Sequence, residues 1–311
     1  TNDTKWDVSA RQDGSIMAWY EESNSNGALK VYIGSNNEIF ANQNSFYLFA
    51  QIGVSDICTA TTVFKNLNYL NTQSVTNMQG MFRNTGSYAM TSLDLGNNFY
   101  TENVTDFGQM FWSTGYYKMK SLNLGDNFNT SSATETNTMF LQTGFTSLES
   151  LDLKDKFYTS NVTDMWSMFD GTGKMAMTNL DLGEEFDTSK VENMTEMFKN
   201  CGYAKMTSLN LGKKFNTSKV KKMEGMFNST GYSLMTELNL GSNFNTSSVS
   251  NMKNMFVNCG HGAMTTLDLG DLFYTTAATD MENMFKDAGT SVMTTLDLGP
   301  AFTKIASAHT D

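Results

Sequence analysis

A motif with a fixed period of 29 residues runs through most of this chain and limits the folds that it can adopt. The tripeptide Leu-Asp/Asn-Leu recurs without insertion at Leu93, Leu122, Leu151, Leu180, Leu209, Leu238, Leu267 and Leu296. Repeats of about 20 to 50 residues are typical of solenoids, in which each unit buries its apolar face against its neighbours. The period therefore predicts one elongated stack of similar turns.

Each repeat begins with a pattern that is typical of a short strand. In residues 208–211, which read Ser-Leu-Asn-Leu, apolar and polar side chains alternate. Such alternation predicts a strand with one buried face. Gly212 follows and is expected to end the strand.

The second half of each repeat has the spacing of a short helix. Thr217 can cap a helix start. Four apolar residues then recur at helical spacing and are expected to face the core: Val220, Met223, Met226 and Phe227. Gly231 is expected to stop the helix in a left-handed conformation.

Stacking such turns predicts a curved molecule. Parallel strands lie about 4.8 Å apart, whereas packed helices need about 8 to 10 Å between their axes. The side that carries the strands must therefore be the shorter one. We expect a solenoid of the α/β leucine-rich-repeat type, with its parallel sheet on the concave side.

The N-terminal residues lack this period and predict a separate cap. Short alternating runs at residues 6–8, 15–20, 28–33 and 38–40 are separated by turn-forming residues. They predict a small antiparallel β unit over residues 1–50 that covers the exposed end of the core. Residues 51–302 then form a solenoid of about eight turns, and residues 303–311 a tail or truncated cap.

Charge and cysteine positions narrow the functional classes. The net charge is −11 and no basic run occurs, which argues against a nucleic-acid partner. No stretch suggests membrane insertion by this segment. Cys201 and Cys259 occupy one repeat slot two turns apart, too far for a disulfide, and Cys58 lies outside the array. We expect three free thiols.

Catalysis has little support in the sequence. The only histidines are His261 and His309, and neither has a plausible serine or cysteine partner. No CxxC or HExxH spacing suggests a metal site. We therefore expect a protein that is not an enzyme and has no catalytic residue, metal or cofactor.

An acidic column is a candidate site on the exposed face of the strands. The residue between the two strand leucines points outward, which aligns Asp94, Asp152, Asp181, Asp268 and Asp297 with asparagines of the other turns. Neighbouring carboxylates about 5 Å apart could hold Ca²⁺ or resemble a glycosidase pair. A solvated ladder of Asp and Asn side chains is the interpretation we favour, because no cleft or asymmetry accompanies them.

A threonine column has a similar choice of interpretations. It comprises Thr72, Thr101, Thr130, Thr159, Thr188, Thr217, Thr246 and Thr275. Regular threonine arrays can bind ice. This column precedes each expected helix, so capping is the interpretation we favour.

A second candidate site is the loop after the helix-stopping glycine, where the repeats differ most from one another. We name its ring-bearing residues the aromatic ridge: Tyr88, Tyr116, Tyr117, Phe145, Tyr203, Tyr232 and His261. Exposed rings at an edge suit contact with a protein or a glycan. The alternative is that the rings only cover the edge of the core.

The motifs MTSLDLG, FNTS, VTNM and MF, together with the N-terminal WDVSARQDGSIMAWYEE and NQNSFYLF, resemble the BspA-type leucine-rich-repeat surface proteins of bacteria. The resemblance covers nearly the whole chain. It implies an exported protein on the bacterial cell surface that adheres to host or neighbouring-cell components. We expect a monomeric adhesion or recognition module, or alternatively a structural spacer that presents another domain.

Overall fold

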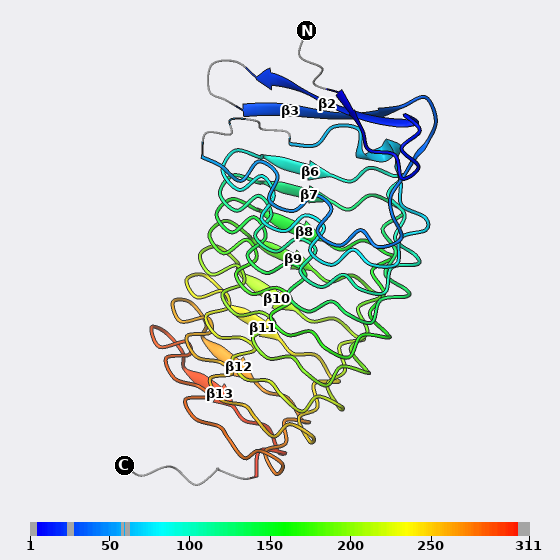
Figure 1. The fold of residues 1–311 in the computed structure, drawn as a ribbon. Coiled ribbons are helices and arrows are strands. Elements are labelled where there is room, and N and C mark those ends of the chain that lie inside the picture. Colours follow the sequence, from blue (N-terminus) through cyan, green and yellow to red (C-terminus); the bar gives the residue numbers. More distant parts are fainter. Residues whose placement is uncertain (1–4, 24–27, 57–58, 60–62, 304–311) are drawn as a thin grey trace.

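The computed structural model describes residues 5–23, 28–56, 59 and 63–303. It is a β-solenoid of about nine turns with a small antiparallel sheet at its N-terminal end (Figure 1). The predicted repeat solenoid, its parallel strand pairing and its β-rich N-terminus are therefore confirmed.

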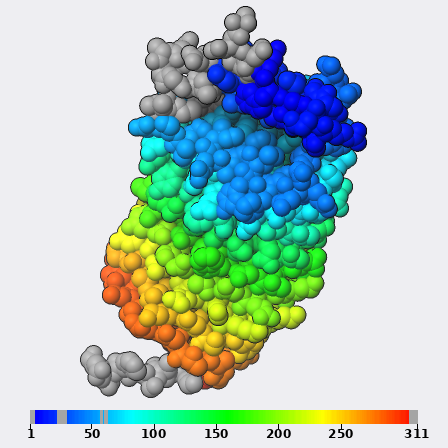
Figure 2. Space-filling view, viewed as in Figure 1, coloured from blue at the N-terminus to red at the C-terminus, as the bar shows by residue number. Residues whose placement is uncertain are grey.

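The N-terminal sheet contains three antiparallel strands, β1 (Lys5–Asp7), β2 (Ile16–Ser23) and β3 (Ala28–Ser35), in the order β1-β2-β3. Trp19 pairs with Tyr32 across β2 and β3, and their rings stack with centroids 5.4 Å apart. The sheet lies across one end of the array, and Figure 2 shows these residues in dark blue above the first turns.

The strands of the array pair in parallel and in register as a series of two-stranded sheets, Leu93 opposite Leu122 for example. They are β4 (Ile39–Phe40), β5 (Leu70–Asn71), β6 (Ser92–Asp94), β7 (Ser121–Asn123), β8 (Ser150–Asp152), β9 (Asn179–Asp181), β10 (Ser208–Asn210), β11 (Glu237–Asn239), β12 (Thr266–Asp268) and β13 (Thr295–Asp297). From β6 to β12 the central leucine is buried and its two neighbours are exposed, as the alternation predicts. Parallel pairing begins with β4 and β5, so the array starts before the first clear repeat.

The predicted helices are absent from the described residues, whose one helical element is the 3₁₀ helix η2 (Leu67–Tyr69). The four residues expected on the core face of a helix, Val220, Met223, Met226 and Phe227, are nevertheless fully buried. The segment is a series of tight turns, because left-handed residues interrupt it. Gly225 and Ser229 have φ of 60° and 59°. Only glycine adopts this region without strain, and most turns place another residue there, so the sequence carried no clear signal.

These turns form a second hydrogen-bonded ladder. Parallel bridges link Asn44 to Asn77 and continue turn by turn to Asp280. The N–H of Phe82 donates to the Met110 carbonyl at 2.9 Å, and the equivalent bonds recur along the stack. Both sides of the solenoid therefore rise by the spacing of paired strands. The difference in rise between a strand side and a helix side, on which the predicted curvature was based, is therefore absent.

The core contains two columns of stacked phenylalanines among buried methionine, leucine and valine side chains. In the column from Phe82 to Phe285, neighbouring ring centroids lie 5.4 to 5.7 Å apart. In the column from Phe128 to Phe302, they lie 6.2 to 6.4 Å apart. These distances are typical of offset stacking. The same spacing fixes every surface residue relative to its copy in the next turn.

The buried threonines bond to neighbouring turns and do not cap helices. The hydroxyl of Thr101 donates to the Asn129 carbonyl at 2.9 Å, and its oxygen also accepts the Asn129 N–H at 2.7 Å. Most members of this column donate to the next turn in the same way. The capping interpretation was wrong because the bonding partner lies 28 residues away in the sequence.

Cys201 and Cys259 are buried free thiols, as expected, and burial raises the pKa of both. Cys58 lies outside the described residues. Gly231 has the predicted left-handed conformation, with φ of 52°, and a Cβ there would collide with the side chain of Met235.

Candidate binding surfaces

The aromatic ridge is a row of ring contacts along the solenoid. Tyr116 stacks on Phe145 with centroids 4.6 Å apart, and Tyr203 stacks on Tyr232 at 4.5 Å. The stack continues from Tyr232 to the ring of His261 at 4.5 Å. At its other end, Tyr117 contacts both Tyr116 and Tyr88 at 4.8 and 4.9 Å. The structure thus brings all seven predicted ridge residues into one row.

Lys174 fills the one gap between the rings of this row. Its ammonium nitrogen lies 5.4 Å from the Phe145 ring centroid and 4.9 Å from that of Tyr203. Both distances are within the range of cation–π attraction. The ridge is therefore a ladder of rings with a single cation inserted between two of them.

Backbone hydrogen bonds hold the ridge at the spacing of the turns. The carbonyls of Tyr116, Phe145 and Tyr203 each accept an N–H of the following turn at 2.9 to 3.0 Å. Ring faces are consequently covered by neighbouring rings, which leaves mainly ring edges and hydroxyls to the solvent. Tyr88 and Tyr117 remain 41% and 42% exposed. Burial raises the pKa of Tyr116 and of Tyr203.

The acidic column lies on the exposed face of the strands, as predicted, but its side chains also shape the backbone. The Oδ1 of Asp94 accepts the N–H of Gly96 at 2.9 Å, and Asn123 accepts that of Gly125 at 3.1 Å. The same bond, to the residue two positions on, recurs for the other predicted members: Asp152, Asp181, Asp268 and Asp297. Aspartate and asparagine are equivalent in this turn.

Adjacent members of the acidic column interact along the stack. The Asn123 amide donates to the Asp94 carboxylate at 3.0 Å, which is the contact expected in a polar ladder. Asp152 and Asp181 pair across β8 and β9, and Asp268 and Asp297 pair across β12 and β13.

Lys154 forms an ion pair with Asp152 at 2.8 Å. Burial opposes ionisation of Asp152, but the bonds and charge of Lys154 outweigh it and hold the pKa below its usual value. No group of three or more metal-ligating side chains occurs in the part of the chain that the structure describes.

His261, at the end of the ridge, contacts the backbone of the next turn. The Nδ1 of His261 lies 3.1 Å from the Asp287 carbonyl, which the neutral or the charged ring can contact as a donor. His309 lies outside the described residues.

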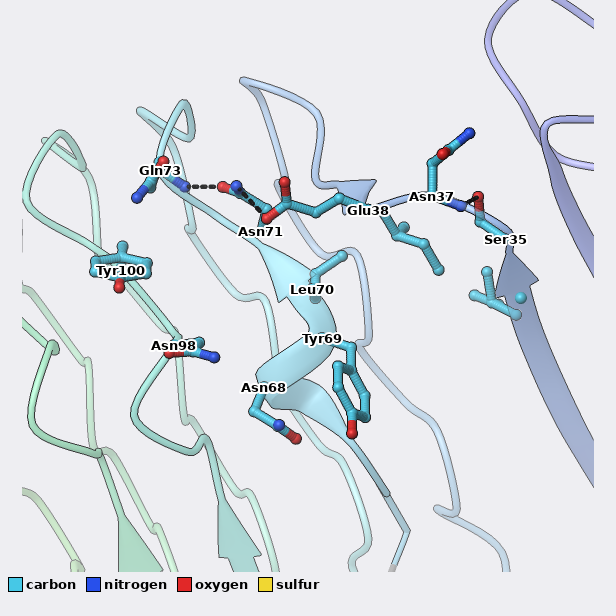
Figure 3. Close-up of a pocket in the computed structure, with 13 residues that line it drawn as sticks. Ser35, Asn37, Glu38, Asn68, Tyr69, Leu70, Asn71, Gln73, Asn98 and Tyr100 are labelled. Carbon is cyan, nitrogen blue, oxygen red and sulfur yellow. Dashed lines mark hydrogen bonds between the residues drawn. The ribbon is translucent and has the colours of Figure 1, made fainter.

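Sequence reasoning missed a cleft of about 740 Å³ between the N-terminal sheet and the first turns of the array. We name it the cap cleft. Its walls are the segment 33–39 at the end of β3, the segment 68–71 in η2 and β5, and three side chains of the same and the next turn, Gln73, Asn98 and Tyr100 (Figure 3). The segments are brought together only by the fold.

The cap cleft combines aromatic rings with amide groups. Tyr69 is 68% exposed, and Figure 3 shows it beside Asn68, with Asn98 and Tyr100 on the adjacent turn. The Asn71 amide donates to the Glu38 carboxylate at 2.7 Å. A weak sequence signal did exist, because position 69 is a tyrosine in a column that the next six turns fill with asparagine, lysine or glutamate.

Fold and surfaces together define a repeat solenoid with stacked side-chain columns and almost no helix. The chain belongs to the family DUF285, described as Mycoplasma protein of unknown function, whose model matches residues 54–150, 115–230, 141–261 and 203–295. No curated protein and no solved structure matches the chain. Within the described ranges, no helix has the length and apolar character that crossing a bilayer requires.

Proposed function

We propose that this chain is an adhesion or recognition module of a bacterial cell surface, which binds a protein or glycan on a host or neighbouring cell. The observation that carries the proposal is the aromatic ridge. Its row of side chains runs from Tyr88 to His261, and Lys174 joins its two groups of rings by contacts with Phe145 and Tyr203. Rings that present their edges and hydroxyls offer a partner both apolar contact and hydrogen bonds.

Repetition supports a role in adhesion to an extended partner. Each turn offers a similar small contact at the same spacing, so weak contacts add along a long or repeated ligand. No single ring then has to be essential. The variable residues of the ridge stand next to the glycine that recurs in every turn, so the partner surface can change without changing the fold.

The sequence resemblance to BspA-type leucine-rich-repeat surface proteins favours the same role. Such proteins are exported and displayed, which agrees with an adhesive function and with an extracellular location. DUF285 is described as a family of unknown function. The proposed surface location therefore depends on the motifs MTSLDLG and FNTS and on the N-terminal segment.

A structural spacer is the second candidate, and one observation favours it. Hydrogen-bonded ladders run along two sides of the array, and the rings between them are stacked. A stack so connected is suited to hold another domain at a distance. In that case the aromatic ridge would serve only to cover the edge of the core.

A bead assay separates the two functions. Fluorescent beads coated with residues 1–311 would be applied to animal epithelial cell layers and to bacterial lawns, with heat-unfolded chain on control beads. We expect folded chain alone to confer adhesion, and added soluble chain to release the beads. Beads that adhere to no surface in the panel, or that soluble chain fails to release, would contradict the adhesion proposal and favour the spacer.

A further inference from the structure

We infer that the cap cleft binds a neutral oligosaccharide, at a site separate from the aromatic ridge. Its volume of about 740 Å³ falls in the range of small-ligand sites in proteins, which is about 300 to 1,000 Å³. In this cleft the end of strand β3 faces side chains of the first turns across an open space.

Two side chains of the cleft, those of Tyr69 and Asn98, are available for a ligand, unlike several of their copies in later turns. Tyr69 and Asn98 occupy one repeat slot in the first and second turns. In the following turns this slot bonds to its neighbour: Asn127 donates to the Asn97 carbonyl at 2.7 Å, and Lys156 to Asn127 at 3.1 Å. The side chains of Tyr69 and Asn98 form no hydrogen bond with any other described residue.

Local backbone geometry presents Tyr69 to the cleft. Asn66 has a left-handed φ of 62° and precedes η2, the one described helical element. In later repeats the equivalent residues form a tight turn, as at residues 97–98. Tyr69 at the end of η2 is 68% exposed, the most exposed of the large apolar side chains.

The chemistry of the lining identifies a class of ligand. A pyranose ring has an apolar C–H face, which packs on an aromatic ring, and hydroxyl groups at its edge, which exchange hydrogen bonds with amides. Tyr69 and Tyr100 provide the rings, and Asn68 and Asn98 provide amides that both donate and accept.

The charge of the residues that line the cap cleft disfavours an anionic ligand. None of the described residues that line the cleft is a lysine, arginine or histidine, and Glu38 is its one carboxylate. That carboxylate already accepts the Asn71 amide at 2.7 Å. A sulfated or sialylated oligosaccharide would meet a negative group without a compensating cation. The ligand is therefore a neutral sugar chain.

The test uses the whole chain and four neutral probes: maltoheptaose, cellohexaose, mannohexaose and chitohexaose. Binding would be measured by saturation-transfer NMR and titration calorimetry, with a heparin hexasaccharide as the anionic comparison. We expect at least one neutral probe to bind and to exceed the heparin fragment in affinity. If no neutral probe binds, or if the heparin fragment binds more tightly, the inference is wrong.

Matched variants locate the binding site. Tyr69→Ala, Tyr100→Ala and Asn98→Ala should each weaken binding of the probe by about tenfold or more, because each removes a ring or an amide from the cleft. Tyr158→Ala is the control, since Tyr158 occupies the repeat slot of Tyr100 two turns away and does not line the cleft. Equal losses for Tyr158→Ala and Tyr100→Ala would overturn the assignment.

The variants also separate this inference from the proposed function. All of them leave the aromatic ridge unchanged, so the ridge-mediated adhesion of coated beads should persist where binding of the oligosaccharide is lost. Conversely, adhesion could fail in every cell panel while the cleft still binds its probe. Tyr69 is exposed, so its truncation should leave the melting temperature of the chain nearly unchanged.

Discussion

The carboxylates of the acidic column have a structural contact that is independent of their charge. The Asp268 Oδ1 accepts the N–H of Gly270 at 2.8 Å, and Asn239 makes the equivalent bond to Gly241 at 2.9 Å. Charge can therefore be removed at this position without losing the turn. Whether the charge itself changes the stability of the fold depends on the side chain opposite it on the neighbouring strand.

Asp268→Asn should be neutral or should raise the free energy of unfolding by about 0.2 to 1 kcal/mol at pH 7, because Asp268 faces Asp297 on the neighbouring strand. Asp268→Ala should instead lower it by about 1 kcal/mol, since the Gly270 N–H loses its acceptor. Urea unfolding measures both. Asp94→Asn is the control without expected gain, because the neighbouring Asn123 already donates to Asp94. A loss of stability in Asp268→Asn that occurs only in the presence of Ca²⁺ would reveal a metal site.

Asp170 is the residue that should make stability depend on pH. Burial raises its pKa from 3.8 to about 6, although the Asn200 amide and Lys199 act in the opposite direction. The folded state thus binds this proton more tightly than the unfolded state. Stability from the protonated carboxyl is complete below about pH 4 and is lost as the pH rises through about 6.

Asp170→Asn cannot titrate and keeps an oxygen for the Asn200 amide, which lies 3.2 Å from Asp170. Its free energy of unfolding should exceed that of the parent by about 1 to 2 kcal/mol more at pH 7 than at pH 4. Urea unfolding at a series of pH values measures the difference. Parallel pH curves for the two proteins would show that Asp170 titrates normally.

At the scale of the element, a second set of buried threonines, just before the glycine that precedes the ridge, links each turn to the one before it. The hydroxyls of Thr114, Thr143 and Thr172 each donate to a phenylalanine carbonyl at 2.7 Å. Cys201 occupies the same slot and instead lies 4.0 Å from the Met177 sulfur. One side-chain hydrogen bond between turns is missing at this position.

Cys201→Thr should restore that bond, to the carbonyl of Phe169, and raise the free energy of unfolding by about 1 kcal/mol. Thr172→Cys makes the reverse change in the previous turn and should lower it by a similar amount. Urea unfolding of both variants provides the comparison. If both substitutions change stability in the same direction, the hydrogen bond is not the cause.

The core residues and the 29-residue period could be predicted from the sequence, because the same pattern recurs in each repeat. Val220 and Met223 are buried as predicted. Residues within one repeat could not exclude the helix that was predicted in its second half. Its spacing of three and four residues is also that of successive tight turns, and several left-handed positions carry residues such as Gln109 and Glu196, with φ of 61° and 56°, in place of glycine.

Contacts between turns explain the other failures of prediction. The threonine hydroxyls bond to carbonyls 28 residues away, which no local pattern reports. The aromatic ridge was predictable because its variation repeats with the period. The cap cleft was not, since it joins residues 33–39 to the first two turns of the array, and its clearest sequence signal was the single tyrosine at position 69.

At the scale of the whole molecule, every side chain repeats at the spacing set by two backbone ladders. Residues of neighbouring turns pair in register on both sides, so equivalent side chains form columns along the array. The strand face carries the acidic column, and the ridge carries the aromatic rings. We propose that the ridge is the face that adheres.

The most direct measurement compares bead adhesion of two five-fold variants. One replaces Tyr116, Tyr117, Phe145, Tyr203 and Tyr232 by serine, and the other replaces Asp94, Asp152, Asp181, Asp268 and Asp297 by asparagine. Because the ridge rings stack on one another, the first variant should melt at a lower temperature but still cooperatively. Tyr88→Ser with Tyr117→Ser, which removes the two most exposed rings of the ridge, serves as a gentler second test.

Aromatic rings supply most of the contact energy at such surfaces, whereas the carboxylates would have to shed water before touching an uncharged partner. We therefore predict that the ridge variant loses most adhesion, that the double variant loses part of it, and that the asparagine variant adheres like the parent. Normal adhesion of the folded ridge variant, together with loss of adhesion in the asparagine variant, would show that the strand face binds and that the ridge only covers the core.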